Sequence, residues 1–90
     1  MYNFHNDAVS IEFILRSKGL ADFHYADAIE KNPLGYIEYA LNEEYKKSAE
    51  KKILINQFDD RYTKYKGKKL TDWESQDSSQ MVKDLRKILD

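Results

Sequence analysis

The scarcity of helix-breaking residues is the feature that most constrains the fold of this chain. Among its 90 residues are three glycines (Gly19, Gly35 and Gly67) and one proline, Pro33. Glycine and proline interrupt helices more strongly than any other residues, so these four positions divide the chain into a few uninterrupted segments. The longest runs from residue 34 to residue 66 and contains only Gly35, near its start. Long helices are therefore the expected building blocks.

The first segment has the spacing of a helix that ends at Gly19. We expect the helix to begin at Asn6 or Asp7, since both residues are good N-caps. Gly19 can end it in the left-handed conformation, with Leu20 folding back on Leu15 as in a Schellman motif. Apolar residues recur within it at three- and four-residue intervals: Ala8, Ile11, Ile14 and Leu15.

A short second helix is predicted from Asp22, as its cap, to about Lys31. Its apolar residues lie three apart on one face: Phe23, Ala26 and Ile29. Asn32 and Pro33 then mark a new helix start, because Asn can cap the first turn and proline at the first helical position loses no hydrogen bond.

The segment after Pro33 predicts one long central helix, from about residue 33 to residue 65. Nine residues share one broad face at 100° per residue: Leu34, Ile37, Ala40, Leu41, Tyr45, Ile55, Phe58, Tyr62 and Tyr65. Such a helix would be about 50 Å long and would protrude from a domain of this size. Two alternatives stay open. Polar residues interrupt the face and favour a break near residues 46–52, and residues 53–55 (Ile-Leu-Ile) could form a short strand.

The chain after Gly67 predicts a turn and a final helix. Thr71 and Glu74 fit a capping box around Trp73, and residues 77–80 have the same capping-box pattern. The final helix has its own apolar side: Met81, Val82, Leu85, Ile88 and Leu89. The predicted fold is therefore all-α, a single domain over residues 1–90, with three to five helices around the long central one.

Catalytic and metal-binding motifs are missing from the sequence. It has no cysteine, which excludes disulfides, thiolate metal sites and cysteine nucleophiles. His24 and Asp27 lie three apart on the second predicted helix, but no motif places a third ligand, and His5 falls in what we expect to be a mobile terminus. The adjacent carboxylates at residues 43–44 and 59–60 point about 100° apart on a helix. We predict no enzymatic activity, no metal and no cofactor.

Charge is segregated along the chain, although its sum is only −1. Residues 1–45 carry a net charge of −5, residues 46–69 carry +6, and residues 70–90 carry −2. The basic segment could contact nucleic acid through phosphate-binding lysines and stacking tyrosines: Lys64, Lys66, Lys68, Lys69, Tyr62 and Tyr65. Acidic flanks would repel the same phosphates, so nucleic acid binding is the alternative hypothesis.

Aromatic residues favour a protein partner instead. They make up 13% of the chain and crowd its first 39 residues, where Tyr36 and Tyr39 fall off the main apolar face. Tyrosine is enriched at protein interfaces, so the predicted partner-binding residues are Tyr36, Tyr39, Phe23 and Tyr25. Homodimerisation through the long helix is a further prediction.

The predicted function is therefore that of a non-catalytic protein-binding module. We expect a small regulator, inhibitor or assembly factor, or else a small subunit of a larger assembly. The Lys-, Tyr-, Asn- and Ile-rich composition is typical of an AT-rich genome, such as that of a phage or another mobile element. With no run of roughly 18 apolar residues, no membrane span is expected, and we predict a cytoplasmic protein.

Overall fold

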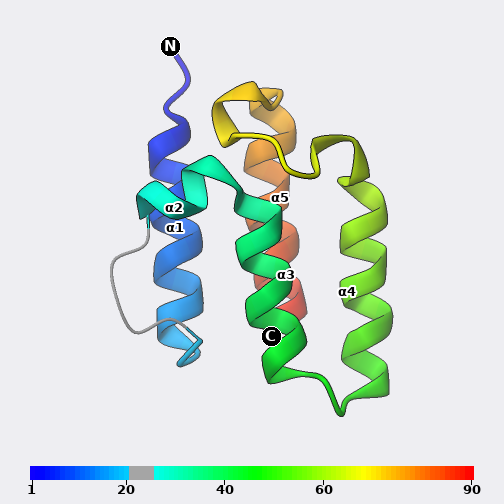
Figure 1. Ribbon diagram of the computed structural model, residues 1–90. Helices are drawn as coiled ribbons and strands as arrows, with labels where there is room; N and C mark the ends of the chain where they lie inside the picture. Colours follow the sequence, from blue (N-terminus) through cyan, green and yellow to red (C-terminus); the bar gives the residue numbers. More distant parts are fainter. Residues whose placement is uncertain (21–25) are drawn as a thin grey trace.

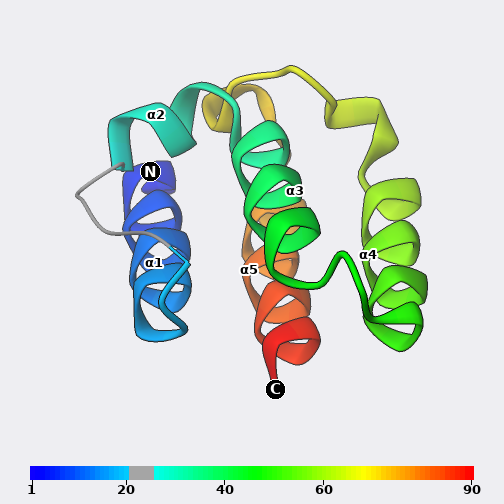
Figure 2. The ribbon, with the colours of Figure 1, turned by 60° about the horizontal axis from the view of Figure 1, so that its bottom comes forward.

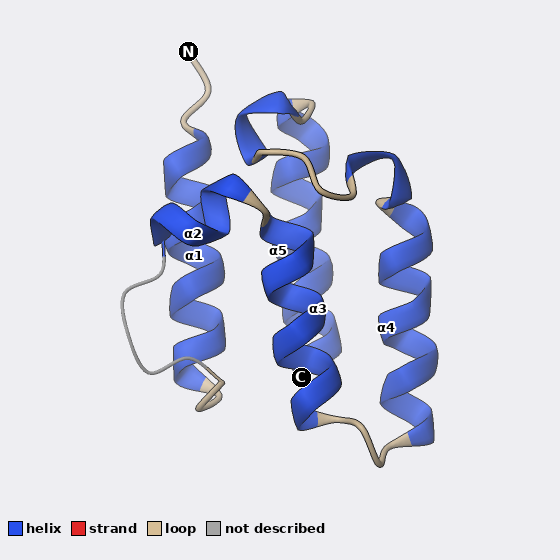
Figure 3. Ribbon diagram, in the orientation of Figure 1, coloured by secondary structure: helices blue, strands red, loops and turns tan. Residues whose placement is uncertain are grey.

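A computed structural model describes residues 1–20 and 26–90, and every regular element in these two ranges is helical. The elements are α1 (Phe4–Ser17), α2 (Ala26–Lys31), α3 (Pro33–Glu44), α4 (Ala49–Arg61) and α5 (Ser75–Leu89), with 3₁₀ turns η1 (Thr63–Tyr65) and η2 (Leu70–Asp72) before α5. The predicted all-α class is confirmed (Figure 3). Residues 53–55, the alternative strand, lie inside α4.

The helices stand side by side around one core. Figure 1 shows α1 and α4 at the two sides of the molecule, with α3 and α5 between them, and Figure 2 keeps this order after a 60° turn. Helix α2 crosses one end of α1 and leads into α3. The molecule measures 40 × 27 × 20 Å, and side chains from all five helices meet in its interior.

The helix end at Gly19 and the helix start at Asn32-Pro33 form as the sequence predicts. Gly19 has a φ of 74°, its N–H donates to the Arg16 carbonyl, and the Leu20 N–H donates to the Leu15 carbonyl. This is the Schellman pattern of hydrogen bonds. Asn32 caps α3 by accepting the Gly35 N–H at 3.2 Å, with Pro33 as the first helical residue.

The starts of the first two helices differ from the prediction or lie outside what the structure describes. Helix α1 begins earlier than Asn6 or Asp7, because the Asn3 side chain caps it and accepts the Asn6 N–H. Helix α2 is described from Ala26 onward, and its predicted cap, Asp22, lies outside the described residues.

The continuous helix from residue 33 to residue 65 is wrong, and the alternative with a break is correct. Helix α3 ends at Glu44, and α4 begins at Ala49. Ser48 is the N-cap of α4, because its Oγ accepts the Lys51 N–H at 3.2 Å. The Ser48 N–H in turn donates to the Tyr45 carbonyl. The break lets both apolar halves pack against the same core, whereas a helix of about 50 Å would exceed the longest dimension of the molecule. A homodimer through one long helix therefore loses its structural basis.

The start of the final helix also differs from the prediction. Residues 70–72 form η2, and α5 begins at Ser75 with Glu74 at the N-cap position, so Thr71 does not cap a helix. The hydroxyl of Tyr65 supports this start: it accepts the Glu74 N–H at 3.4 Å and donates to Asp77 at 2.5 Å. The predicted apolar side of the helix is confirmed, since its five residues are all buried.

Candidate functional site

The predicted partner-binding residues have different environments. Tyr39 on α3 is 71% exposed, whereas Tyr36 is partly buried against the core. Phe23 and Tyr25 lie outside the described residues. Of the two predicted partner-binding residues that the structure describes, Tyr39 is the one exposed to solvent.

A second exposed apolar surface lies on α1, and the sequence analysis missed it. Phe13 is 67% exposed and Val9 is 44% exposed. They lie one turn apart, so they form one strip that points away from the buried residues Ile11 and Leu15. The four-residue spacing of Val9 and Phe13, about one helical turn, is the sequence signal that could have revealed this strip. On α4, Ile53 is also 59% exposed.

The tyrosines of the basic segment belong to the core. Tyr62 and Tyr65 are 2% and 5% exposed, and both stack on Trp73, with ring centroids 5.5 and 4.2 Å away. The Tyr62 hydroxyl donates to Asp84 at 2.5 Å. Burial, reinforced by these carboxylate contacts, raises the pKa of both tyrosines. Neither ring could stack on a base without leaving the core.

The four lysines predicted for nucleic acid contact all remain at the surface. Two of them have carboxylate partners: Lys64 Nζ lies 3.8 Å from Asp77, and Lys66 Nζ lies 3.2 Å from Asp59. Lys68 and Lys69 are exposed in the connection between η1 and η2. The local positive charge is thus partly compensated within the molecule.

A carboxyl pair joins α3 to α4 beside Lys66. Glu38 on α3 lies beside Asp59 on α4; burial, followed by the interaction with Asp59, raises the pKa of Glu38 to about 7. The same interaction lowers the pKa of Asp59, and Lys66 lowers it further. The two carboxyl groups therefore take up two negative charges less readily than two separate ones would, and the pair can respond to pH near neutrality.

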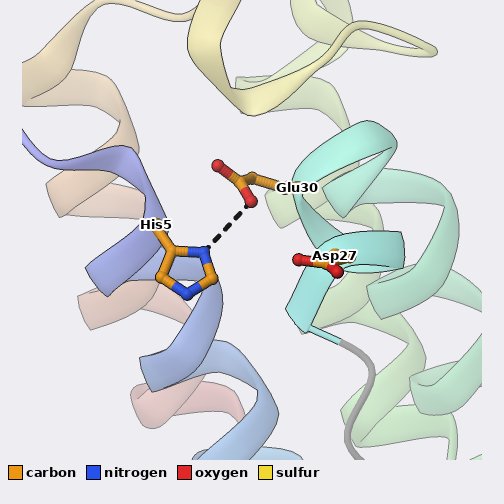
Figure 4. Close-up of side chains that lie close together, drawn as sticks. All are labelled: His5, Asp27 and Glu30. Atoms are coloured by element: carbon orange, nitrogen blue, oxygen red, sulfur yellow. Dashed lines mark hydrogen bonds and ion pairs between the residues drawn. The ribbon is translucent and has the colours of Figure 1, made fainter.

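A cluster of three metal-ligating side chains joins α1 to α2. Figure 4 shows His5, Asp27 and Glu30 pointing toward one another, with His5 Nδ1 3.1 Å from Glu30 Oε2. One ligand atom from each residue lies within 4.8 Å of the others. His5, which the sequence placed in a terminus before the first helix, is the second residue of α1. The other predicted partner of Asp27, His24, lies outside the described residues.

Buried contacts hold the two helices of this cluster in place. The side chain of Glu12 is 6% exposed, and its Oε2 accepts the backbone N–H of Ala26, the first residue of α2, at 3.0 Å. Ala8 and Ile29, each three or fewer residues from a ligand, are completely buried. A surface pocket adjoins the cluster and is lined by both of its carboxylates together with Lys31, Lys69 and Thr71.

Comparison with known proteins gives no relative: no family model, curated protein or solved structure matches the chain. Within residues 1–20 and 26–90, the helices are too short or too polar for any of them to cross a membrane.

Proposed function

We propose that the chain is a non-catalytic protein-binding module that docks through the outer face of α1. The observation that supports this is Phe13, a large apolar side chain that is 67% exposed and has Val9 beside it one turn earlier. A regular helix fixes the two side chains in one orientation, so a partner can cover them without an added cost for ordering the backbone. Apolar anchors at this spacing are typical of helix-in-groove recognition.

The partner that fits this face is another protein with an apolar groove and a basic rim. The part of the chain that contains α1 is acidic, since the first 45 residues carry a net charge of −5. Opposite charge on the rim of the groove would speed association and make it sensitive to salt.

We extend the proposal to the compartment, the role and the source of the protein. The module would act in the cytoplasm as a regulator, inhibitor or assembly factor of a phage or another mobile element. Binding through exposed aromatic residues suits such a role, because the protein acts by occupying a surface. Nucleic acid binding through the basic segment is less well supported, since Tyr62 and Tyr65 are buried and Lys64 and Lys66 have carboxylate partners.

Capture from a host extract with the full-length chain tests the proposal, with bound proteins quantified by mass spectrometry. Phe13→Ala should weaken capture of one specific protein by about fivefold or more, the loss of about 1 kcal/mol that marks an interface anchor. Ile53→Ala is the matched control, because Ile53 is similarly exposed but lies on α4, at the other side of the molecule.

Two results would contradict the proposal. In the first, Phe13→Ala captures the protein as well as the original chain does, or the loss occurs only with Ile53→Ala. In the second, nucleic acid binds tightly near physiological salt and dissociates when the four lysines at positions 64, 66, 68 and 69 are replaced by glutamate. That result would establish the alternative function, because phosphate contacts produce strong salt dependence.

A further inference from the structure

We propose that His5, Asp27 and Glu30 form a binding site for a divalent transition-metal ion, for which Zn²⁺ is the appropriate probe. The ligand atoms of the three side chains lie within 4.8 Å of one another, so small side-chain rotations can bring all three onto one ion. His5 lies more than 20 residues before the two carboxylates in the sequence, on a different helix, and the fold brings the three together. This proposal is independent of the protein-binding function.

The fold holds the backbones of the three residues in position. Glu12 fixes the first residue of α2 against α1 through a buried hydrogen bond to Ala26. Asp27 and Glu30 lie three residues apart, on adjacent turns of one face of α2, and His5 faces them from the first turn of α1. Because the backbone positions are fixed by the core, binding requires only that three side chains be ordered, and ligands held in this way favour affinity.

The set of ligand atoms selects the class of metal. An imidazole nitrogen with two carboxylate oxygens suits Zn²⁺ and its neighbours, whereas Mg²⁺ and Ca²⁺ prefer oxygen ligands alone. The two carboxylates compensate the charge of a dication while the imidazole is neutral. Three protein ligands leave one position of a tetrahedral ion for water, and the pocket lined by Asp27, Glu30 and Thr71 provides space at the surface for it.

Proton competition gives the site a distinctive signature. His5 Nδ1 lies 3.1 Å from Glu30 Oε2, and a metal ion bound between them would replace this contact. Since only neutral imidazole binds a metal, protons compete with the ion for this nitrogen.

Isothermal titration of the full chain with ZnCl₂ tests the site. His5→Ala, Asp27→Asn and Glu30→Gln should each weaken binding by about tenfold or more, because even loss of an outer-shell partner costs 10- to 100-fold. His24→Ala tests the other histidine of the chain, and Glu43→Gln, at an exposed position of α3, is the carboxylate control, which should bind as the original chain does. Circular dichroism of each variant verifies that it is folded.

Three outcomes would overturn the proposal. Zinc binding that persists in both His5→Ala and Glu30→Gln would place the ion elsewhere, as would binding lost in His24→Ala and retained in His5→Ala. Equal affinity for Mg²⁺ would show that the imidazole is not a ligand. The two conservative variants, Asp27→Asn and Glu30→Gln, keep side-chain shape, so a folded variant that loses zinc binding supports the site directly.

Discussion

Replacing Glu38 by glutamine should stabilise the protein at neutral and higher pH. The pKa of Glu38 is about 7 in the folded chain and 4.5 in the unfolded one. The folded state therefore binds an extra proton between these values, and stability falls as the pH rises across that window. Above it, a charged Glu38 faces Asp59. Glutamine removes this repulsion, and its amide can donate to the Asp59 carboxylate at every pH.

The size of the effect follows from the difference in pKa. A rise from 4.5 to about 7 corresponds to about 3 kcal/mol, at about 1.4 kcal/mol for each pKa unit. Glu38 is only partly buried, and solvent screens the repulsion, so we expect a gain of about 1 kcal/mol. The gain should be present at about pH 8 and should vanish at about pH 3.5, below both pKa values, where Glu38 is protonated in both states.

Urea denaturation followed by circular dichroism, at both pH values, measures this difference. Glu43→Gln serves as the control, because Glu43 is exposed on the same helix, and its replacement should change stability little at either pH. The reasoning would be refuted by a stability change in Glu38→Gln that is equal at the two pH values, or by a loss at pH 8.

Three further substitutions test the elements that define the fold, each by urea denaturation. Ser48→Ala should cost about 1 kcal/mol by removing the N-cap of α4, and an unchanged midpoint would mean that packing alone sets the break. Gly19→Ala should cost about 1 kcal/mol because alanine is strained at this positive φ. An added Cβ would meet no atom within 4 Å, so no steric clash adds to the cost, and a neutral result would show that the backbone adjusts freely. Tyr62→Phe should cost about 1 kcal/mol by removing the hydrogen bond to Asp84, unless Arg61 and Gln80, which also contact that carboxylate, compensate fully.

The sequence predicted those features of the fold that depend on interactions between residues close together in the chain. The ends at Gly19 and Asn32-Pro33 depend on hydrogen bonds within a few residues, and the spacing of the α5 core residues depends only on helical geometry. The break between α3 and α4 was harder to predict. Ser48 is an acceptable residue within a helix and also a good cap, and the choice between the two depends on tertiary packing that sequence periodicity does not contain.

The candidate sites were less predictable for the same reason. His5 joins Asp27 and Glu30 only because α2 folds across α1, a contact between residues far apart in the sequence. Phe13 lies off the apolar stripe that faces the core, so the periodicity of the core residues does not reveal it. Tyr62 and Tyr65 have the spacing of core residues, but they also lie among lysines in the sequence, which is typical of a nucleic-acid-binding segment. Their burial in the structure shows that they are core residues.

The stack of Tyr62, Trp73 and Tyr65 also makes the molecule its own optical reporter. Trp73 is the one tryptophan in the sequence and is 4% exposed; it stacks on Tyr62 and Tyr65, in the connection that leads from α4 to α5. Its emission therefore reports on the joint between these two helices, while ellipticity reports on all the helices together. Comparing the two signals during denaturation shows whether this joint opens with the rest of the domain or before it, without attaching any label.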